Sequence, residues 1–242
     1  MSKIISIVNQ KGGVGKTTTA VNLSSIVASM GYKTLLIDID PQANACLGIG
    51  VTRDKMEYGI YDILIGEADI EQVIIKTYQE NLYLIPSDSD LVGAQIELVS
   101  EIGREYKLKK ALEKIKNNYD YVFIDCPPTL GILTLNALTA CDSVLIPIQC
   151  EFYALDGVGE LNNTISLVKE NLNQNLEIEG VLLTMYDGRT NLSNDVVREV
   201  VNYFKDKTYK TMIPRNVRLS EAPSYGKAIT DYDKECIGAR SY

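Results

Sequence analysis

A glycine-rich segment near the N-terminus constrains the fold of this chain more than any other feature of its sequence. The segment reads KGGVGKTT, and it lies between an apolar run at residues 4–8 and a stretch that predicts a helix over residues 16–30. Glycines let backbone N–H groups converge on phosphate oxygens, and the N-terminus of the following helix adds partial positive charge. The order of strand, loop and helix therefore predicts a phosphate-binding loop, formed by Lys11, Gly12, Gly13, Val14, Gly15, Lys16, Thr17 and Thr18.

The two lysines of this loop are expected to act differently. Lys16 should reach the β- and γ-phosphates of a nucleotide, and the Thr17 hydroxyl should bind Mg²⁺. The common pattern GxxxxGK[ST] requires a glycine at position 10, where this chain has Gln10 followed by the additional Lys11. Because Lys16 already serves the phosphates, we expect Lys11 to point outward, toward the nucleotide of a partner.

Apolar and amphipathic segments alternate along the whole chain. Strands are predicted at residues 4–8, 34–37, 82–85, 121–124, 144–148 and 181–184. Most of these runs are continuous, which is typical of parallel strands buried on both faces. Helices are predicted at residues 16–30, 69–76, 94–101, 106–117, 133–139, 155–171 and 193–204. This order predicts an α/β P-loop NTPase fold, a doubly wound, mostly parallel sheet flanked by helices, in a single domain over residues 1–242.

Two aspartate-bearing segments are expected to complete the site. Asp38 and Asp40 follow the second predicted strand and lie on the same side of an extended chain. Asp125 ends the apolar run at residues 121–124 and precedes two prolines, as in a Walker B element. We expect Asp125 to hold Mg²⁺ directly or through water, Asp38 to support the metal shell, and Asp40 to orient or deprotonate an attacking water.

The composition excludes several other kinds of site. The chain has no histidine, which rules out Ser-His-Asp and Cys-His catalysis and histidine-ligated metals. Its five cysteines are scattered without a CxxC pair, so we expect reduced thiols and neither a disulfide framework nor a zinc site. No apolar run approaches the ~20 residues that would span a bilayer, and the N-terminus does not resemble a secretory signal. We therefore expect a cytoplasmic protein with no membrane partner.

Charge is distributed unevenly along the chain. The net charge is −8 overall, −10 for residues 1–185 and +2 for residues 186–242. Between residues 203 and 227, two acidic residues stand against six basic ones, which are Lys205, Lys207, Lys210, Arg215, Arg218 and Lys227. Such a cluster fits sequence-independent contacts with a phosphate backbone, and a solvated surface is an equally good interpretation of the sequence alone.

Four segments together resemble those of the ParA/Soj chromosome-partitioning ATPases, which carry the deviant Walker A motif. They are the KGGVGKTT loop, DIDPQ at residues 38–42, DCPP at residues 125–128 and IPRNVRLSEAPS at residues 213–224. The likeness covers essentially the whole chain, and the last segment discriminates best, because relatives that share the loop are not expected to carry it. The resemblance implies Mg²⁺ and ATP as cofactors, slow ATP hydrolysis, and a homodimer that forms when ATP binds.

The resemblance also implies roles for individual residues of the loop and its surroundings. Lys11 is expected to cross the dimer to the other subunit's phosphates, and Gly12 to lie where the two loops approach closely. Asp40 is expected to activate the hydrolytic water, so the expected catalytic residues are Lys11, Lys16 and Asp40. Pro214 and Asn216 match the segment that lies beside adenine in such proteins.

A further implication concerns partners. The ATP-bound dimer is expected to bind double-stranded DNA without sequence preference, and a ParB-type DNA-binding protein is expected to stimulate hydrolysis. This would place the protein on the nucleoid. The expected DNA-binding residues are Arg189, Arg218, Lys205, Lys207, Lys210 and Lys227.

Relatives of this group leave other functions open. A MinD-like, membrane-associated spatial regulator shares the ATPase but binds lipid, and this chain shows no basic amphipathic terminal helix to support that function. A nitrogenase-reductase-like ATPase needs an interfacial iron–sulfur cluster, which the cysteine spacing does not favour. Relatives also continue beyond residues 238–242 into a last helix, so we expect that helix to be missing or truncated here.

Overall fold

A single sheet organises the part of the chain that the computed structural model describes, which is residues 2–152, 154–155 and 158–242. Its order is β3-β4-β2-β5-β1-β6-β7-β8, and every neighbouring pair is parallel except β3 and β4. The strands are β1 (Lys3–Ile7), β2 (Thr34–Asp38), β3 (Ile75–Lys76), β4 (Leu82–Ile85), β5 (Tyr121–Asp125), β6 (Ser143–Gln149), β7 (Glu177–Tyr186) and β8 (Thr208–Pro214). The predicted doubly wound, mostly parallel sheet is confirmed.

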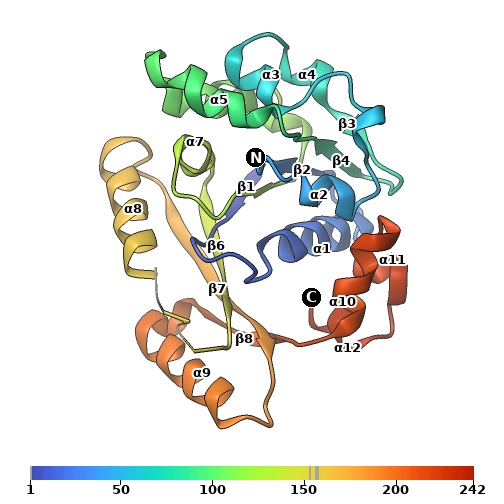
Figure 1. Cartoon of the computed structure of the whole chain (residues 1–242), viewed down its shortest axis with the longest axis vertical. Coiled ribbons are helices and arrows are strands. Elements are labelled where there is room, and N and C mark those ends of the chain that lie inside the picture. The colour runs from blue at the N-terminus through green and yellow to red at the C-terminus, as the bar shows by residue number, and fades with distance from the viewer. Residues whose placement is uncertain (1, 153, 156–157) are drawn as a thin grey trace.

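Helices cover both faces of this sheet (Figure 1). Apolar residues of α1, α2 and α10–α12 form one core cluster with the sheet, and those of α3–α9 form the other. The helices are α1 (Lys16–Ser29), α2 (Asn44–Gly48), α3 (Ile60–Ile65), α4 (Ile70–Val73), α5 (Leu91–Glu97), the 3₁₀ turn η2 (Leu98–Ser100), α6 (Lys107–Glu113), α7 (Ile132–Ala140), α8 (Val158–Asn171), α9 (Asn191–Phe204), α10 (Val217–Glu221), α11 (Ile229–Asp233) and α12 (Ile237–Ser241).

Helix α1 packs closely on the sheet because the residues it buries are small. Ala20, Ser24, Ser25 and Ala28 are all at most 1% exposed. Small side chains let the helix axis approach the strands, and both buried serines find hydrogen-bond partners. The close packing fixes the N-terminus of α1 directly behind the glycine loop.

The sequence does not predict the two edge strands, β3 and β8. In β8 the side chains of Tyr209, Lys210 and Thr211 are exposed, so the strand lacks the continuous apolar run of a strand buried on both faces. The helix predicted over residues 69–76 is wrong in its second half, because α4 ends at Val73 and the next residues pair with β4. Two consecutive β-branched isoleucines favour the extended backbone there.

Boundaries of other helices also differ from the prediction, by three residues or more in three of them. Helix α5 begins at Leu91, three residues earlier than expected, and continues into η2. Helix α6 ends at Glu113, ahead of the predicted end at residue 117. The helix predicted over residues 155–171 is observed from Val158, and residues 156–157 of that prediction lie outside the described residues.

Asn173 offers a test of how the loop after α8 holds the core. Its buried side chain donates hydrogen bonds to the carbonyls of Leu138 (3.0 Å) and Cys141 (2.7 Å). Asn173→Ala should lower the free energy of unfolding by about 2 kcal/mol, because two buried carbonyls lose a donor. The control is Asn171→Ala, whose side chain is exposed and should leave stability nearly unchanged. Urea denaturation measures both variants, and equal losses would contradict this account.

Candidate nucleotide-binding site

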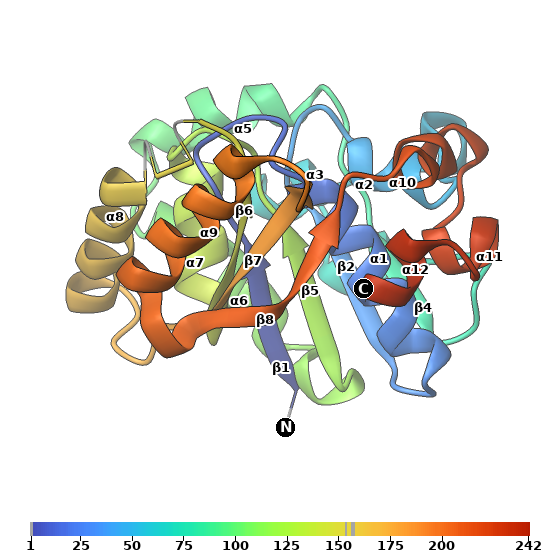
Figure 2. The same cartoon turned by 90° about the horizontal axis from the view of Figure 1, so that it is seen from below.

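Strands β1, β5 and β2 are neighbours in the sheet, and their carboxyl ends meet at one edge. Ile7 of β1 and Asp38 of β2 both lie opposite Asp125 of β5 in the strand register. The glycine loop leaves β1 at this same edge, while the N-terminus lies at the opposite edge (Figure 2). The fold thus brings the predicted loop and both predicted strand-end carboxylates together, as expected for the ligand edge of a doubly wound sheet.

Hydrogen bonds within the loop hold its backbone open. Asn9 anchors the loop, since its side-chain amide donates to the Pro147 carbonyl (2.7 Å) and its Oδ1 accepts from the Lys11 N–H (2.9 Å). Gly13 and Gly15 adopt left-handed conformations (φ 75° and 89°) that a residue with a Cβ rarely adopts. No side chain caps the N-terminus of α1, so its first N–H groups remain available to an anion.

Lys16 lines the cavity formed by the glycine loop. It is only 7% exposed, and its ammonium donates a hydrogen bond to the Lys11 carbonyl (3.1 Å). Burial lowers the pKa of Lys16, and attraction to Asp125, Cys126 and Asp40 opposes that shift. A buried ammonium with spare donors is suited to phosphate oxygens, which would supply the missing acceptors.

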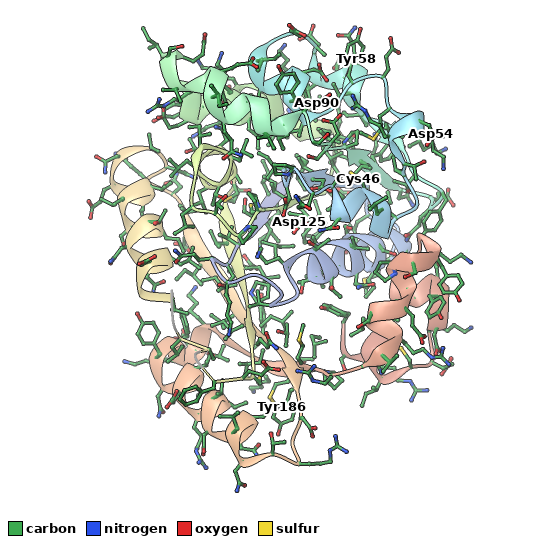
Figure 3. The ribbon with its side chains drawn as sticks, in the orientation of Figure 1. Cys46, Asp54, Tyr58, Asp90, Asp125 and Tyr186 are labelled. Atoms are coloured by element: carbon green, nitrogen blue, oxygen red, sulfur yellow. The ribbon has the colours of Figure 1, made fainter. Side chains whose placement is uncertain are left out.

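Asp125 provides the strongest indication of a metal site. The residue is fully buried, and neither carboxylate oxygen has a hydrogen-bond partner of normal geometry in the described structure. Burial and then the nearby Asp38 raise the pKa of Asp125 well above its usual value, while Thr17 and Lys16 lower it. An unpaired buried carboxylate beside a threonine hydroxyl matches the oxygen ligands that Mg²⁺ prefers. Figure 3 shows Asp125 near the centre of the molecule.

Asp38 differs from Asp125 because its oxygens are already occupied. They accept hydrogen bonds from the N–H groups of Asp40 (3.1 Å), Ala45 (3.0 Å) and Cys46 (3.1 Å) and from the Cys46 thiol (3.3 Å). Burial raises the pKa of Asp38 to about 6, although the bonds from Asp40 and Cys46 oppose the shift. The structure therefore gives Asp38 a second role beside the predicted support of the metal shell, that of ordering the loop after β2.

Asp40 lies in that ordered loop. It is 9% exposed, and its Oδ1 accepts from the Gln42 N–H (2.9 Å). The buried Ser87, at the end of β4, donates its hydroxyl to the Asp40 carbonyl (2.8 Å). The N–H of Ser87 also donates to the Cys46 thiol (3.3 Å). Hydrogen bonds therefore link the loop after β2, helix α2 and the segment after β4.

Two adjoining cavities follow the glycine loop. One of about 340 Å³ is lined by the loop, Asp40 and Pro128, and the other of about 360 Å³ by Pro214, Asn216 and their neighbours. Gly15, Thr18 and Met185 line both of them, so a single ligand can extend from the loop to the Pro214 segment. The predicted phosphate-binding and adenine-binding residues thus border one continuous site.

Several lining residues were not predicted from the sequence. Gln42, Asn44, Pro128 and Met185 line the phosphate cavity. Met185 has a left-handed backbone (φ 51°) at the end of β7, where the register with β8 shifts. Gln42 within the DIDPQ segment and Pro128 within the DCPP segment had a sequence signal, whereas nothing local marks Met185 as a lining residue.

Comparisons with known proteins agree with this site. A family model described as an AAA domain matches residues 2–178. The chain is 59% identical to the sporulation initiation inhibitor protein Soj of Bacillus subtilis, over 100% of this chain and 96% of that protein. It is 52% identical to the chromosome-partitioning ATPase Soj of Treponema pallidum, over 100% of this chain and 94% of that protein. The chain belongs to the ParA/Soj family of chromosome-partitioning ATPases.

A solved structure extends the comparison to ligands. The Mycobacterium smegmatis protein named cobyrinic acid a,c-diamide synthase, with a bound ATP analogue and magnesium, has a TM-score of 0.90 and 36% identity to this ParA/Soj chain, over 100% of this chain and 91% of that one. The orphaned Asp125 carboxylate, the open glycine loop and the cavities fit such a ligand. The ParA/Soj chain is thus an ATP hydrolase that binds Mg-ATP.

The basic residues of this ParA/Soj chain do not form one patch. Arg189 follows β7 and Arg218 follows β8, so both lie where the parallel strands have their carboxyl ends, on the same side as the glycine loop. We call this side the nucleotide edge of the sheet. Lys205 and Lys207 precede the parallel β8 and therefore lie at the opposite edge. Lys210 lies within β8 itself.

Lys227, the sixth of these residues, lies apart from the others. It lines a third cavity of about 440 Å³ beside α1, α2 and α10, which shares Thr17 and Thr18 with the phosphate cavity. The sequence cluster between residues 203 and 227 is therefore distributed over four places, which are the start of β8, β8 itself, the end of β8 and the third cavity.

Three arginines at the nucleotide edge form ion pairs, and Arg215, which directly follows β8, pairs with Glu151. Arg189 donates to both oxygens of Asp187 (2.8 and 2.6 Å), and its side chain is 89% exposed. Arg218 pairs with Glu221 (2.9 Å) and Asp233 (3.5 Å). Exposed ion pairs are worth only ~0–1 kcal/mol, so these guanidinium groups can exchange their partners for another anion.

The described residues contain no other metal centre. No group of three or more cysteine, aspartate or glutamate side chains among them is arranged to hold a metal ion. All five cysteines are free thiols in this structure, and four of them are buried. Among the described helices none is long and apolar enough to cross a membrane.

The contrast between Asp125 and Asp38 gives a test of the site. Asp125→Asn should raise the free energy of unfolding by ~1–3 kcal/mol without metal or nucleotide, because it removes an unpaired buried carboxylate. It should also abolish the rise in Tm that Mg-ATP produces. The matched change, Asp38→Asn, should destabilise the same protein, since an amide nitrogen would face N–H donors. Stability changes of the same sign in both variants would contradict these assignments.

Proposed function

We propose that ATP binding joins two copies of this chain face to face, and that the dimer binds DNA without sequence preference. A ParB-type partner then stimulates ATP hydrolysis, which releases the dimer from DNA. The protein would accordingly work in the cytoplasm, on the nucleoid. The proposal rests first on the exposed tip of the glycine loop.

The tip of the glycine loop is free to approach a second copy. Gly12 and Gly13 are exposed, and a Cβ built on either would meet no atom of the described residues within 4 Å. Lys11 uses its carbonyl to hold Lys16 but no described interaction holds its ammonium. A lysine whose backbone belongs to one site and whose charge is free is suited to reach the phosphates of a facing site.

Residues of this chain support a hydrolytic role for the loop after β2. Bound Mg²⁺ would offset the charge that develops on the phosphates. Asp40 borders the phosphate cavity, where its carboxylate is placed to orient a water or accept its proton. Lys16 would hold the phosphates, while Thr17 and Asp125 would ligate the metal.

Contacts with DNA are assigned first to Arg189 and Arg218 at the nucleotide edge. Arg189 and Arg218 lie on loops that follow neighbouring strands, so an assembly that forms through the nucleotide edge would bring two pairs of them together. Two acidic copies could bind DNA only through such local positive charge, because more distant charges are screened beyond ~8 Å at physiological salt. The lysines before β8 would contribute as a separate, second contact.

Gly12→Val tests the approach of the two loops. The new side chain fits the isolated chain, because the Cβ position of Gly12 is open and its backbone is not left-handed. ATP binding should therefore persist within about twofold, whereas ATP-dependent dimerisation should be lost through steric conflict between loops. Light scattering with ATP measures the dimer, and nucleotide fluorescence measures binding. Dimers of Gly12→Val as stable as those of the unchanged protein would refute the proposed assembly.

Arg189→Glu and Arg218→Glu test the DNA contact. Each should weaken DNA retention at least about tenfold in co-sedimentation with ATP, because a phosphate contact becomes a repulsion. The control is Arg198→Glu, which changes an equally exposed arginine of α9 that pairs with Asp195. Dimerisation should persist in all three variants. Retention that does not depend on nucleotide or salt would contradict the proposal, and binding to liposomes in place of DNA would favour a membrane-associated regulator.

Ser87→Ala tests how Asp40 is positioned. Removing the hydroxyl frees the Asp40 carbonyl from a bond worth ~1 kcal/mol, so kcat should fall about fivefold with little change in KM for ATP. Ser89→Ala is the matched control, because its side chain is exposed two residues away. A kcat for Ser87→Ala equal to that of the control would show that this hydrogen bond does not serve catalysis.

A further inference from the structure

Helix α5 and η2 present an apolar stripe to the surroundings of the protein. Val92, Ile96 and Val99 are 52%, 74% and 64% exposed, and their spacing of four and three residues places them on one side of the segment. The other side is buried in the core through Leu91 and Leu98. The segment is therefore apolar on both sides, although the core accounts for only one of them.

The stripe lies beside the nucleotide site. Ser87, which holds the Asp40 carbonyl, comes four residues before α5 begins. Gln95 of α5 lies against Gly131, where a built Cβ would be 3.7 Å from its Oε1. Gly131 ends the loop that follows β5, and Pro128 of that loop lines the phosphate cavity. A molecule bound to α5 would thus touch a helix that is linked to Asp40 through Ser87 and to Pro128 through Gly131.

The border of the stripe is acidic. Residues 88–101 contain four carboxylates and no lysine or arginine. The first two pair with Arg53 and the last pairs with Lys107, while Glu97 accepts the hydroxyl of Tyr61 (3.0 Å). Arg104, whose guanidinium donates to the Val99 carbonyl, pairs with Glu105 (3.0 Å), so five carboxylates against three cations leave a net negative surface around the exposed isoleucine and valine side chains. Figure 3 marks Asp90, at the start of α5, on this surface.

We propose that this stripe is a docking surface for a helical segment of a regulatory partner, apolar on one face and basic on the other. Such a segment would bury the stripe and pair its cations with the acidic border, in the way that amphipathic helices bind apolar grooves. DNA and anionic lipid would be repelled by the same border, and two copies of the stripe would bring like charges together. The inference rests on the proposed function in one respect, that a partner regulates hydrolysis.

A peptide-binding experiment tests the docking surface. The probe is a fluorescent synthetic peptide of about 20 residues with leucine on one helical face and lysine on the other, added to the whole chain. The double variant V92Q/I96Q should weaken binding by about tenfold or more, because two exposed apolar side chains lose their contact. Glu97→Gln should weaken it severalfold at low salt and less at high salt. The control is Leu167→Gln on α8. Leu167 is 60% exposed, and the variant should bind the peptide as the unchanged protein does.

Other outcomes would overturn the inference. Unchanged binding by V92Q/I96Q would do so, and so would equal binding of a peptide with glutamate in place of lysine. Loss of ATP-dependent dimerisation in V92Q/I96Q would instead place the stripe between two copies of the chain. Dimerisation and DNA retention of the unchanged protein are measured in parallel. If the unchanged protein neither dimerises nor retains DNA, the proposed function fails, and the peptide-binding result is judged separately.

Discussion

Two buried carboxylates on neighbouring strands, one held by backbone N–H groups and the other with no such donor among the described residues, determine how this site works. Asp38 and Asp125 lie opposite each other in the register of β2 and β5. Asp38 uses its charge to order the loop that carries Asp40, so its desolvation is offset within the protein. Asp125 has only Thr17 and Lys16 nearby to favour its charge, and no backbone N–H in the described part of the chain donates to it, so its oxygens are available to a metal ion. The same fold thus produces a structural aspartate and a candidate metal ligand from two almost equivalent positions.

Most of the site could be predicted because it is local in the sequence. The glycine loop, Lys16 and the two strand-end aspartates each follow a recognisable apolar run, and parallel strands bring such ends to one edge. The division of labour between Asp38 and Asp125 could not be predicted, because it depends on which carboxylate meets the N–H groups of a later turn. Met185 was missed for a related reason, since its position in the site arises from the backbone at the end of β7.

The interpretation of the basic residues shows where sequence reasoning was limited. Lys205, Lys207, Arg215 and Arg218 are close in sequence, which suggested one cluster. Because β8 is an edge strand with exposed polar side chains, it was not predicted, and its length separates the lysines before it from the arginines after it. Edge strands are polar because one side of their backbone is unpaired. One missed strand therefore changed the expected shape of a charged surface.

The unpaired carboxylate of Asp125 has a consequence for the life of the protein in the cell. Any ligand that binds only the folded chain shifts the folding equilibrium, and here the shift also relieves a cost that folding itself creates. Proteases act on transiently opened molecules in proportion to their population. Copies that hold Mg-ATP should consequently outlast copies that do not. The ATP supply of the cell would then set how many molecules of this ATPase exist, in addition to how fast each molecule hydrolyses ATP.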